Sequence, residues 1–247
     1  NPDACLCRTW RAEIELDRDA AAAAATDARA GMACAETEMR ARAALAVALV
    51  RLGDVDGARE QIQATTSSDP PHPRGELAAA LLARSTGDVA AARDAAAKAI
   101  ASAAYLDPWP KRDPKRAAAF VDHSPYRSVV RDAHMVEAMV AIDQKQYDDA
   151  RAILAGVLHD APDDAEAVYD VALIEDLEGH FNPAREGYLR ALKLRPSLAA
   201  ARYNLALLTL RFGVMEEARH HAQAFKRDFP GDPRAADLEL RLQSLPQ

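Results

Sequence analysis

Small residues return at the same places along this chain every 34 residues. Four glycines, Gly53, Gly87, Gly179 and Gly213, mark one position of the pattern. Alanine stands seven residues before each glycine and again five residues after it, and arginine follows that second alanine. Larger apolar side chains stand two residues after each glycine. A period of this length, with small residues at fixed positions, is typical of an array of helical repeats.

The pattern divides most of the chain into five units without internal gaps, at 39–72, 73–106, 131–164, 165–198 and 199–232. In each unit we expect two helices around a turn. The fourth unit predicts helices at 165–178 and 183–194, separated by Gly179 because glycine tolerates the positive φ of a helix terminus. Pro196 then ends the unit, since a proline disfavours helical geometry at the residue before it.

These positions resemble those of the tetratricopeptide repeat (TPR) family. The residues that carry the resemblance best, in the last two units, are Gly179, Phe181, Ala184, Tyr188, Ala191, Pro196, Gly213, Met215, Ala218, Phe225 and Pro230. The resemblance implies an all-α fold, a right-handed superhelical solenoid of antiparallel helix pairs with about five TPR units and helical caps. The repeated alanines would lie where helices cross, because only a small side chain allows close approach there.

Some positions depart from the family pattern. Lys145 stands where the other units have the turn glycine, and Ala83 and Ala96 occupy positions that are bulky in the family. We therefore expect looser packing in residues 73–106 than in residues 165–232.

Three segments lie outside the repeats. Residues 1–38 are predicted to form an N-terminal helical cap, with a helical stretch at Thr9–Arg29, and residues 233–247 a C-terminal capping helix. Residues 107–130 interrupt the period with four prolines, Trp109 and several basic residues. This insert is either an exposed docking loop or a connector whose Trp109 fills the gap in the repeat register.

By the resemblance, the first helix of each unit lines the concave surface of the solenoid. Its inward positions form an apolar and aromatic stripe in the last three units, which Leu77 and Leu81 extend if the insert leaves the groove continuous. Tyrosine and methionine in such a stripe are typical of an interaction site. The alternative is that the insert or the C-terminal cap folds into the groove. The candidate partner-binding residues are Met135, Met139, Tyr169, Leu173, Tyr203, Leu207, Asn204 and, in the insert, Trp109.

Charge and motifs narrow the possible functions. The net charge of −7 argues against a nucleic-acid surface, which is normally basic. No apolar run approaches the ~18–20 residues of a transmembrane helix. The seven histidines are scattered, and no phosphate-binding loop, nucleophile elbow or HExxH motif occurs. We therefore expect no catalytic residues, no metal site and no cofactor.

All three cysteines, Cys5, Cys7 and Cys34, lie before the repeats. A Cys5–Cys7 bridge would close a strained ring. A disulfide from Cys5 or Cys7 to Cys34 would fix the start of the chain against the first helices in an oxidising compartment. The alternatives are three reduced thiols in a cytoplasmic protein and a redox-active CxC site.

These observations favour a non-catalytic scaffold or adaptor that binds a protein partner, as a peptide or helix, within a larger hetero-complex. A permanently integrated structural subunit that docks through its convex face and the insert is the alternative, and a redox protein using Cys5 and Cys7 is a third hypothesis. The chain starts at Asn1 rather than methionine, so either a leader was removed or the sequence was trimmed, and a secretory leader would be invisible in both cases. The cysteines favour a periplasmic or extracellular location over a cytoplasmic one.

Overall fold

The computed structural model describes residues 2–106 and 126–243, which form thirteen α-helices and no strand. The predicted all-α fold of antiparallel helix pairs is confirmed. The insert residues 107–125, with Trp109, lie outside the described residues. The helices are α1 (Pro2–Asp17), α2 (Ala21–Gly31), α3 (Glu38–Leu52), α4 (Val55–Thr66), α5 (Pro73–Ser85), α6 (Val89–Leu106), α9 (Arg127–Asp143), α10 (Tyr147–Asp160), α11 (Ala165–Leu177), α12 (Phe181–Leu194), α13 (Ala199–Arg211), α14 (Met215–Asp228) and α15 (Arg234–Gln243).

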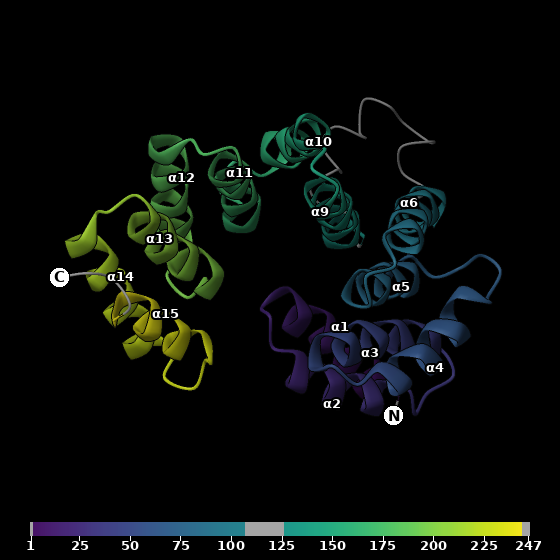
Figure 1. The fold of residues 1–247 in the computed structure, drawn as a ribbon. Helices are drawn as coiled ribbons and strands as arrows, with labels where there is room; N and C mark the ends of the chain where they lie inside the picture. The colour runs from purple at the N-terminus through teal and green to yellow at the C-terminus, as the bar shows by residue number, and fades with distance from the viewer. Residues whose placement is uncertain (1, 107–125, 244–247) are drawn as a thin grey trace. The chain divides into compact units, whose positions relative to one another are not determined.

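Each predicted repeat contains two helices, and in four of them these helices pack as a pair: α3 with α4, α5 with α6, α11 with α12, and α13 with α14 (Figure 1). The four marker glycines end the first helix of their pairs with φ between 75° and 83°. A Cβ at any of these four glycines would meet no atom within 4 Å, so the backbone angle requires glycine and crowding does not. Lys145 takes the same position with φ 59°, as a non-glycine residue in the left-handed region.

The repeated alanines are buried where the two helices of a pair pack together. Ala172 of α11 is 1% exposed and Ala184 of α12 is fully buried. A Cβ added to Gly187 of α12 would lie 2.6 Å from the Cβ of Ala172, closer than two carbon atoms can approach without a shift. The close crossing of α11 and α12 therefore needs a small residue on both helices.

The chain forms two compact units, unit 1 (residues 1–144) and unit 2 (residues 145–247). The two helices of the third predicted repeat, α9 and α10, belong to different units. In unit 1 one hydrophobic core, rich in alanine, runs through α1 to α6 and α9. In unit 2 the core contains larger side chains, among them the fully buried Tyr188 and Phe225.

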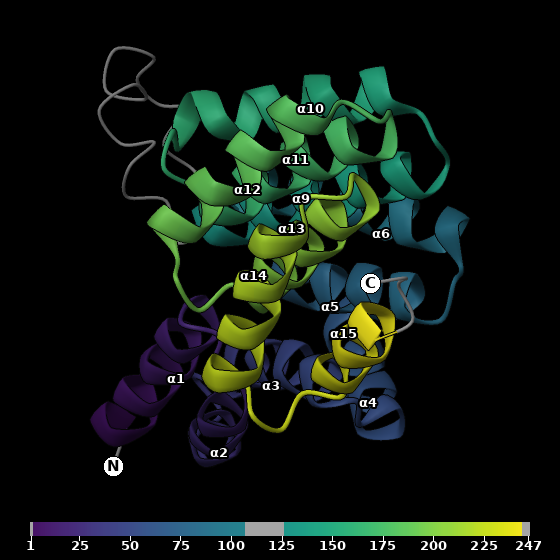
Figure 2. The ribbon, with the colours of Figure 1, turned by 60° about the vertical axis from the view of Figure 1, so that its left-hand side comes forward.

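The N-terminal segment differs from the single helical stretch expected at Thr9–Arg29. It forms two helices, α1 and α2, which pack against each other and against α3 (Figures 1 and 2). The chain turns between them at residues 18–20, where Asp19 has φ 60°. Aspartate is one of the few residues that enter this region readily, because its short polar side chain can bond locally.

An open groove of about 400 Å³ lies between α4 of the first repeat, α5 of the second repeat and the turn that precedes α6. Its floor includes Ile62, Ala79, Leu82 and Ala83, so it lies beside one of the alanines that replace a bulky residue. At the other end of the chain, α15 packs on α13 and α14. Across the described helices, none is both long enough and apolar enough to cross a membrane.

Candidate partner-binding surfaces

In unit 2, the first helices of the last two repeats, α11 and α13, carry five of the predicted partner-binding residues. All five side chains are half-buried. We call Tyr169 and Leu173 of α11 with Tyr203, Asn204 and Leu207 of α13 the tyrosine surface. The Asn204 side-chain amide donates a hydrogen bond of 2.9 Å to the Tyr169 hydroxyl, which links the two helices. The Tyr169 ring also lies 5.8 Å from that of the buried Tyr188, so packing fixes its orientation.

Helix α15 covers one end of the tyrosine surface. The Tyr203 hydroxyl donates a 2.7 Å hydrogen bond to Asp237, and the Arg234 guanidinium lies 5.5 Å from the centre of the Tyr203 ring. Leu238 of α15 is buried in the same cluster that Tyr203 and Leu207 contact. Burial and the bond to Asp237 raise the pKa of Tyr203. The C-terminal helix thus covers the tyrosine surface at Tyr203. This agrees with the alternative prediction that the C-terminal cap folds into the groove.

The two predicted methionines lie in unit 1. Met135 and Met139 are half-buried on α9, near the pair of His134 and Glu137, whose Nδ1 and Oε2 atoms are 3.0 Å apart. Because the methionines and the tyrosine surface belong to different units, a single stripe that joins them stays a prediction.

The inward-facing residues of the first two repeats, by the same register, are Val47 of α3 and Leu77 and Leu81 of α5. Val47 and Leu77 are buried in the core of unit 1, with 1% and 2% exposure, and Leu81 packs against the same core, so these residues offer little surface to a partner. Helix α1 supplies Leu16 to this core.

A buried ionic cluster joins α1 to α3 and α5 in unit 1. Glu13 of α1 accepts from the Arg40 guanidinium at 2.7 Å and pairs with Arg74 of α5 at 2.6 Å. The Arg74 side chain is only 5% exposed. Beside it, the His72 ring accepts a hydrogen bond from the Arg74 backbone amide, and burial, reinforced by the nearby Arg74 charge, lowers the pKa of His72 to about 4.

Three of the five periodic arginines, to which the sequence pattern assigned no role, connect successive helix pairs, whereas Arg59 pairs with Asp56 of its own helix α4. Arg93 of α6 donates to Gln144 at 2.8 Å, Arg151 of α10 to Glu175 of α11 at 3.0 Å, and Arg185 of α12 to Glu217 of α14 at 2.8 Å. Each partner lies in the next helix pair, so this position stabilises stacking of repeats. The recurrence of arginine at the same position of every repeat is the sequence signal that could have predicted this role.

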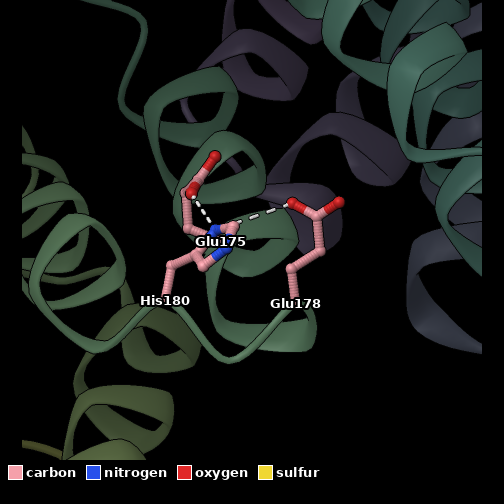
Figure 3. A group of neighbouring side chains, drawn as sticks. All are labelled: Glu175, Glu178 and His180. Carbon is pink, nitrogen blue, oxygen red and sulfur yellow. Dashed lines mark hydrogen bonds and ion pairs between the residues drawn. The ribbon is translucent and has the colours of Figure 1, made fainter.

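One group of side chains in unit 2 has the composition of a metal site. Glu175, Glu178 and His180 gather at the turn between α11 and α12, and the Nδ1 atom of His180 lies 2.8 Å from a Glu175 oxygen (Figure 3). Arg151 pairs with both glutamates. Although burial raises the pKa of Glu175, its bonds to His180 and Arg151 outweigh this and lower it. These partners make the group an ion-pair network between α10 and α11.

The cysteines are divided between a disulfide and a free thiol. Cys5 of α1 and Cys34, which follows α2, form a disulfide, one of the two pairings that the sequence left open. Cys7 is exposed and unpaired. Near it, α1 exposes Leu6, Trp10 and Ile14, an apolar face that sequence reasoning missed although the spacing of these residues placed them on one side of a helix.

Comparison with known proteins agrees with this architecture. The tetratricopeptide repeat family matches residues 43–107, 135–180 and 178–233, and the chain belongs to this family. No curated protein matches the chain in a sequence comparison.

Solved structures with the same fold share little sequence with this chain. PilF of Pseudomonas aeruginosa is 16% identical, with a TM-score of 0.60 over 96% of this chain and 97% of its own. PilW, a widely conserved type IV pilus biogenesis factor, is 16% identical, with a TM-score of 0.65 over 95% and 98%. The Cut9–Hcn1 structure of the APC/C is 13% identical, with a TM-score of 0.71 over 98% of this chain and 43% of that one. At these identities the likeness establishes the fold alone.

Proposed function

We propose that this protein is a non-catalytic interaction scaffold whose tyrosine surface binds an extended peptide or a helix of a protein partner. Repeats of this family generally serve as interaction modules, and the partner implied is therefore a protein. The observation that carries the proposal is the state of Tyr169, Leu173 and Asn204. Hydrogen bonding and packing hold Tyr169 and Asn204 in place, and all three side chains keep part of their surface in contact with solvent.

A preorganised apolar surface of this kind favours binding because little side-chain freedom is lost on association. Tyr169 offers a fixed aromatic ring, Leu173 an apolar contact, and Asn204 a polar group for the partner's backbone. Aromatic anchors of this type contribute on the order of 2 kcal/mol each to binding. The Tyr203 end is already occupied by α15, so we place the binding centre at Tyr169 and Leu173.

The test compares two leucine substitutions in unit 2. Leu173→Glu places a charge on the tyrosine surface. Leu189→Glu places the same charge on α12, at a leucine that is 36% exposed. Partner capture from the native host, identified by mass spectrometry, is expected for the wild type and for Leu189→Glu and lost for Leu173→Glu. The thermal unfolding of both variants should match the wild type. Equal capture by Leu173→Glu would contradict the proposal.

A structural subunit of a multiprotein complex is the second candidate. Leu52 and Phe212 are 50% and 45% exposed where α3 and α13 end. Exposed apolar side chains outside the tyrosine surface favour contacts elsewhere on the chain. If Leu52→Ser with Phe212→Ser abolishes capture while Leu173→Glu does not, the structural subunit is the better description.

We place the protein in the periplasm or outside the cell, as part of a hetero-complex. The Cys5–Cys34 disulfide supports this location because such bonds persist in oxidising compartments. Protein isolated from its native host and denatured without reductant should then show one titratable thiol, that of Cys7. Three thiols would indicate a cytoplasmic protein.

A further inference from the structure

Helix α1 presents an apolar face to solvent. Leu6, Trp10 and Ile14 are 36%, 50% and 49% exposed, and Cys7 is exposed beside them. We call these four residues the α1 outer face. Cys7, Trp10 and Ile14 are spaced three and four residues apart, the spacing at which one helix packs along another. Ala12 and Leu16, on the other side of the helix, are buried in the core of unit 1.

We propose that the α1 outer face is the interface of a symmetric dimer, in which the α1 helices of two copies pack antiparallel. A two-fold interface must be complementary to itself, since the same surface meets its own copy. The charges at the ends of α1 meet this requirement. Asp3 lies in the first turn of the helix, and Arg18 directly follows its last residue.

The charges also select the direction of pairing. When Cys7 of one copy faces Ile14 of the second copy, an antiparallel arrangement places Asp3 opposite Arg18 at both ends. A parallel arrangement would place Asp3 opposite Asp3 and Arg18 opposite Arg18, which is repulsive. The antiparallel arrangement also brings opposite ends of the two helix dipoles together.

The helix is held rigidly enough to serve as an interface. The Cys5–Cys34 disulfide fixes its beginning, and the Glu13 pairs with Arg40 and Arg74 fix its second half. An ordered surface loses little entropy on association. Because one helix pair forms a small interface, the dimer should dissociate on dilution.

The proposal commits to a second copy for a reason of charge. Helices that lie on membranes typically carry a strongly basic polar face, whereas α1 carries four acidic residues and only two basic ones, Arg8 and Arg11, both of which pair with Asp27 of α2. The surface belongs to unit 1 and shares no residue with the tyrosine surface, so it can be tested independently of partner binding.

The first experiment is sedimentation velocity of the full chain over a range of concentrations. The wild type should shift from monomer to dimer as concentration rises. Trp10→Ser with Ile14→Ser should remain monomeric, and its circular dichroism should match the wild type although the Trp10 ring also lies 6.0 Å from the Arg40 guanidinium. The matched control, Leu189→Ser with Leu240→Ser, removes apolar side chains of 36% and 67% exposure elsewhere and should dimerise like the wild type. A wild type that stays monomeric at every concentration would overturn the proposal.

The second experiment tests the direction of pairing. Asp3→Arg should weaken the dimer, and Asp3→Arg combined with Arg18→Asp should restore it. The maleimide reaction of Cys7 should slow as wild-type concentration rises but not in the Trp10→Ser with Ile14→Ser variant. A Cys7–Cys7 linked dimer, or failure of the double charge exchange to restore dimerisation, would contradict the antiparallel interface. A shift of tryptophan emission on adding phosphatidylcholine vesicles, without dimerisation, would assign the face to a membrane instead.

Discussion

Units 1 and 2 are built from the same 34-residue repeat but treat their inward residues differently. In unit 1 the inward Val47 and Leu77 are buried in the core to which α1 contributes Leu16, and Arg74 is 5% exposed and pairs with Glu13. Met135 and Met139 of α9 are half-buried. In unit 2 the equivalent positions are half-buried aromatic and aliphatic side chains that α15 covers at one end only. The repeat pattern therefore specifies helix pairs, while the helices that flank a unit decide whether its inner surface stays available.

The cores of the two units also differ in the size of the side chains that they bury. The core of unit 1 consists mainly of alanine, with a few leucines and valines, so part of its cohesion comes from an ionic cluster and a disulfide. Unit 2 buries Tyr188 and Phe225, whose large apolar areas stabilise it directly. This contrast predicts that electrostatic changes act mainly on unit 1 and packing changes mainly on unit 2.

The largest expected effect is that of Glu13→Gln in unit 1. The substitution keeps the shape of the side chain but removes the carboxylate that pairs with the buried Arg74, which leaves Asp17 as the nearby acidic group. Breaking a buried ion pair in this way costs about 3–5 kcal/mol. Hydrogen exchange measured by mass spectrometry should show faster exchange in α1, α3 and α5 and unchanged exchange in unit 2.

The matched control for this change is Glu166→Gln in unit 2. Glu166 pairs with Arg195 at 2.7 Å, but the two side chains are 38% and 40% exposed. Exposed pairs contribute less than about 1 kcal/mol. Equal destabilisation by the two substitutions would show that the ionic cluster of unit 1 has no special role.

The second prediction concerns the pH dependence of unit 1. Burial lowers the pKa of His72 from 6.5 to about 4, so the folded state favours the neutral imidazole. Between these values the unfolded chain binds more protons, and stability therefore falls as pH falls from 6.5 towards 4. Each unit of pKa difference corresponds to about 1.4 kcal/mol, so the loss reaches about 3 kcal/mol.

His72→Asn isolates this contribution. Asparagine can still cap α5, as the His72 ring does by accepting from the Arg74 amide, but it does not titrate. The free energy of unfolding, measured by urea denaturation from pH 7 to pH 4, should fall less steeply in the variant. Parallel curves for the two proteins would mean that His72 is not the titrating group.

The sequence predicted the helix pairs well because their determinants are local. Gly179 and the alanines at 172 and 184 act within one pair, so their spacing carried the information. The cover over Tyr203 depends on α15, which follows no repeat pattern. Leu77 is buried in a core to which α1, also outside the repeats, contributes Leu16. The repeat pattern gave Arg40 and Arg74 no role, and only the fold shows that both pair with Glu13.

The third prediction tests packing in unit 2. Ala172→Leu should overpack the crossing of α11 and α12 and cost about 1–3 kcal/mol, because Gly187 of α12 leaves no room there. Ala152→Leu, at an exposed position of α10, serves as the control and should change the free energy of unfolding by less than about 0.5 kcal/mol. If urea denaturation gives equal losses for both, the assigned repeat register is wrong.

The smallest expected effect lies at the turn where unit 2 begins. Lys145 has φ 59° at the position that glycine takes in the other four repeats, and a side chain in this region costs about 1 kcal/mol. Lys145→Gly should remove that strain, although the greater freedom of glycine in the unfolded chain offsets part of the gain. We expect a net stabilisation of about 0.5 kcal/mol in urea denaturation.

The reverse change, Gly179→Lys, should destabilise by about 1 kcal/mol, since φ there is 83° and the surrounding space is open. Both changes alter the same position of the repeat. If Lys145→Gly raises the free energy of unfolding and Gly179→Lys lowers it, the backbone angle is the cause. Destabilisation by both would show instead that the Lys145 side chain contributes a contact of its own.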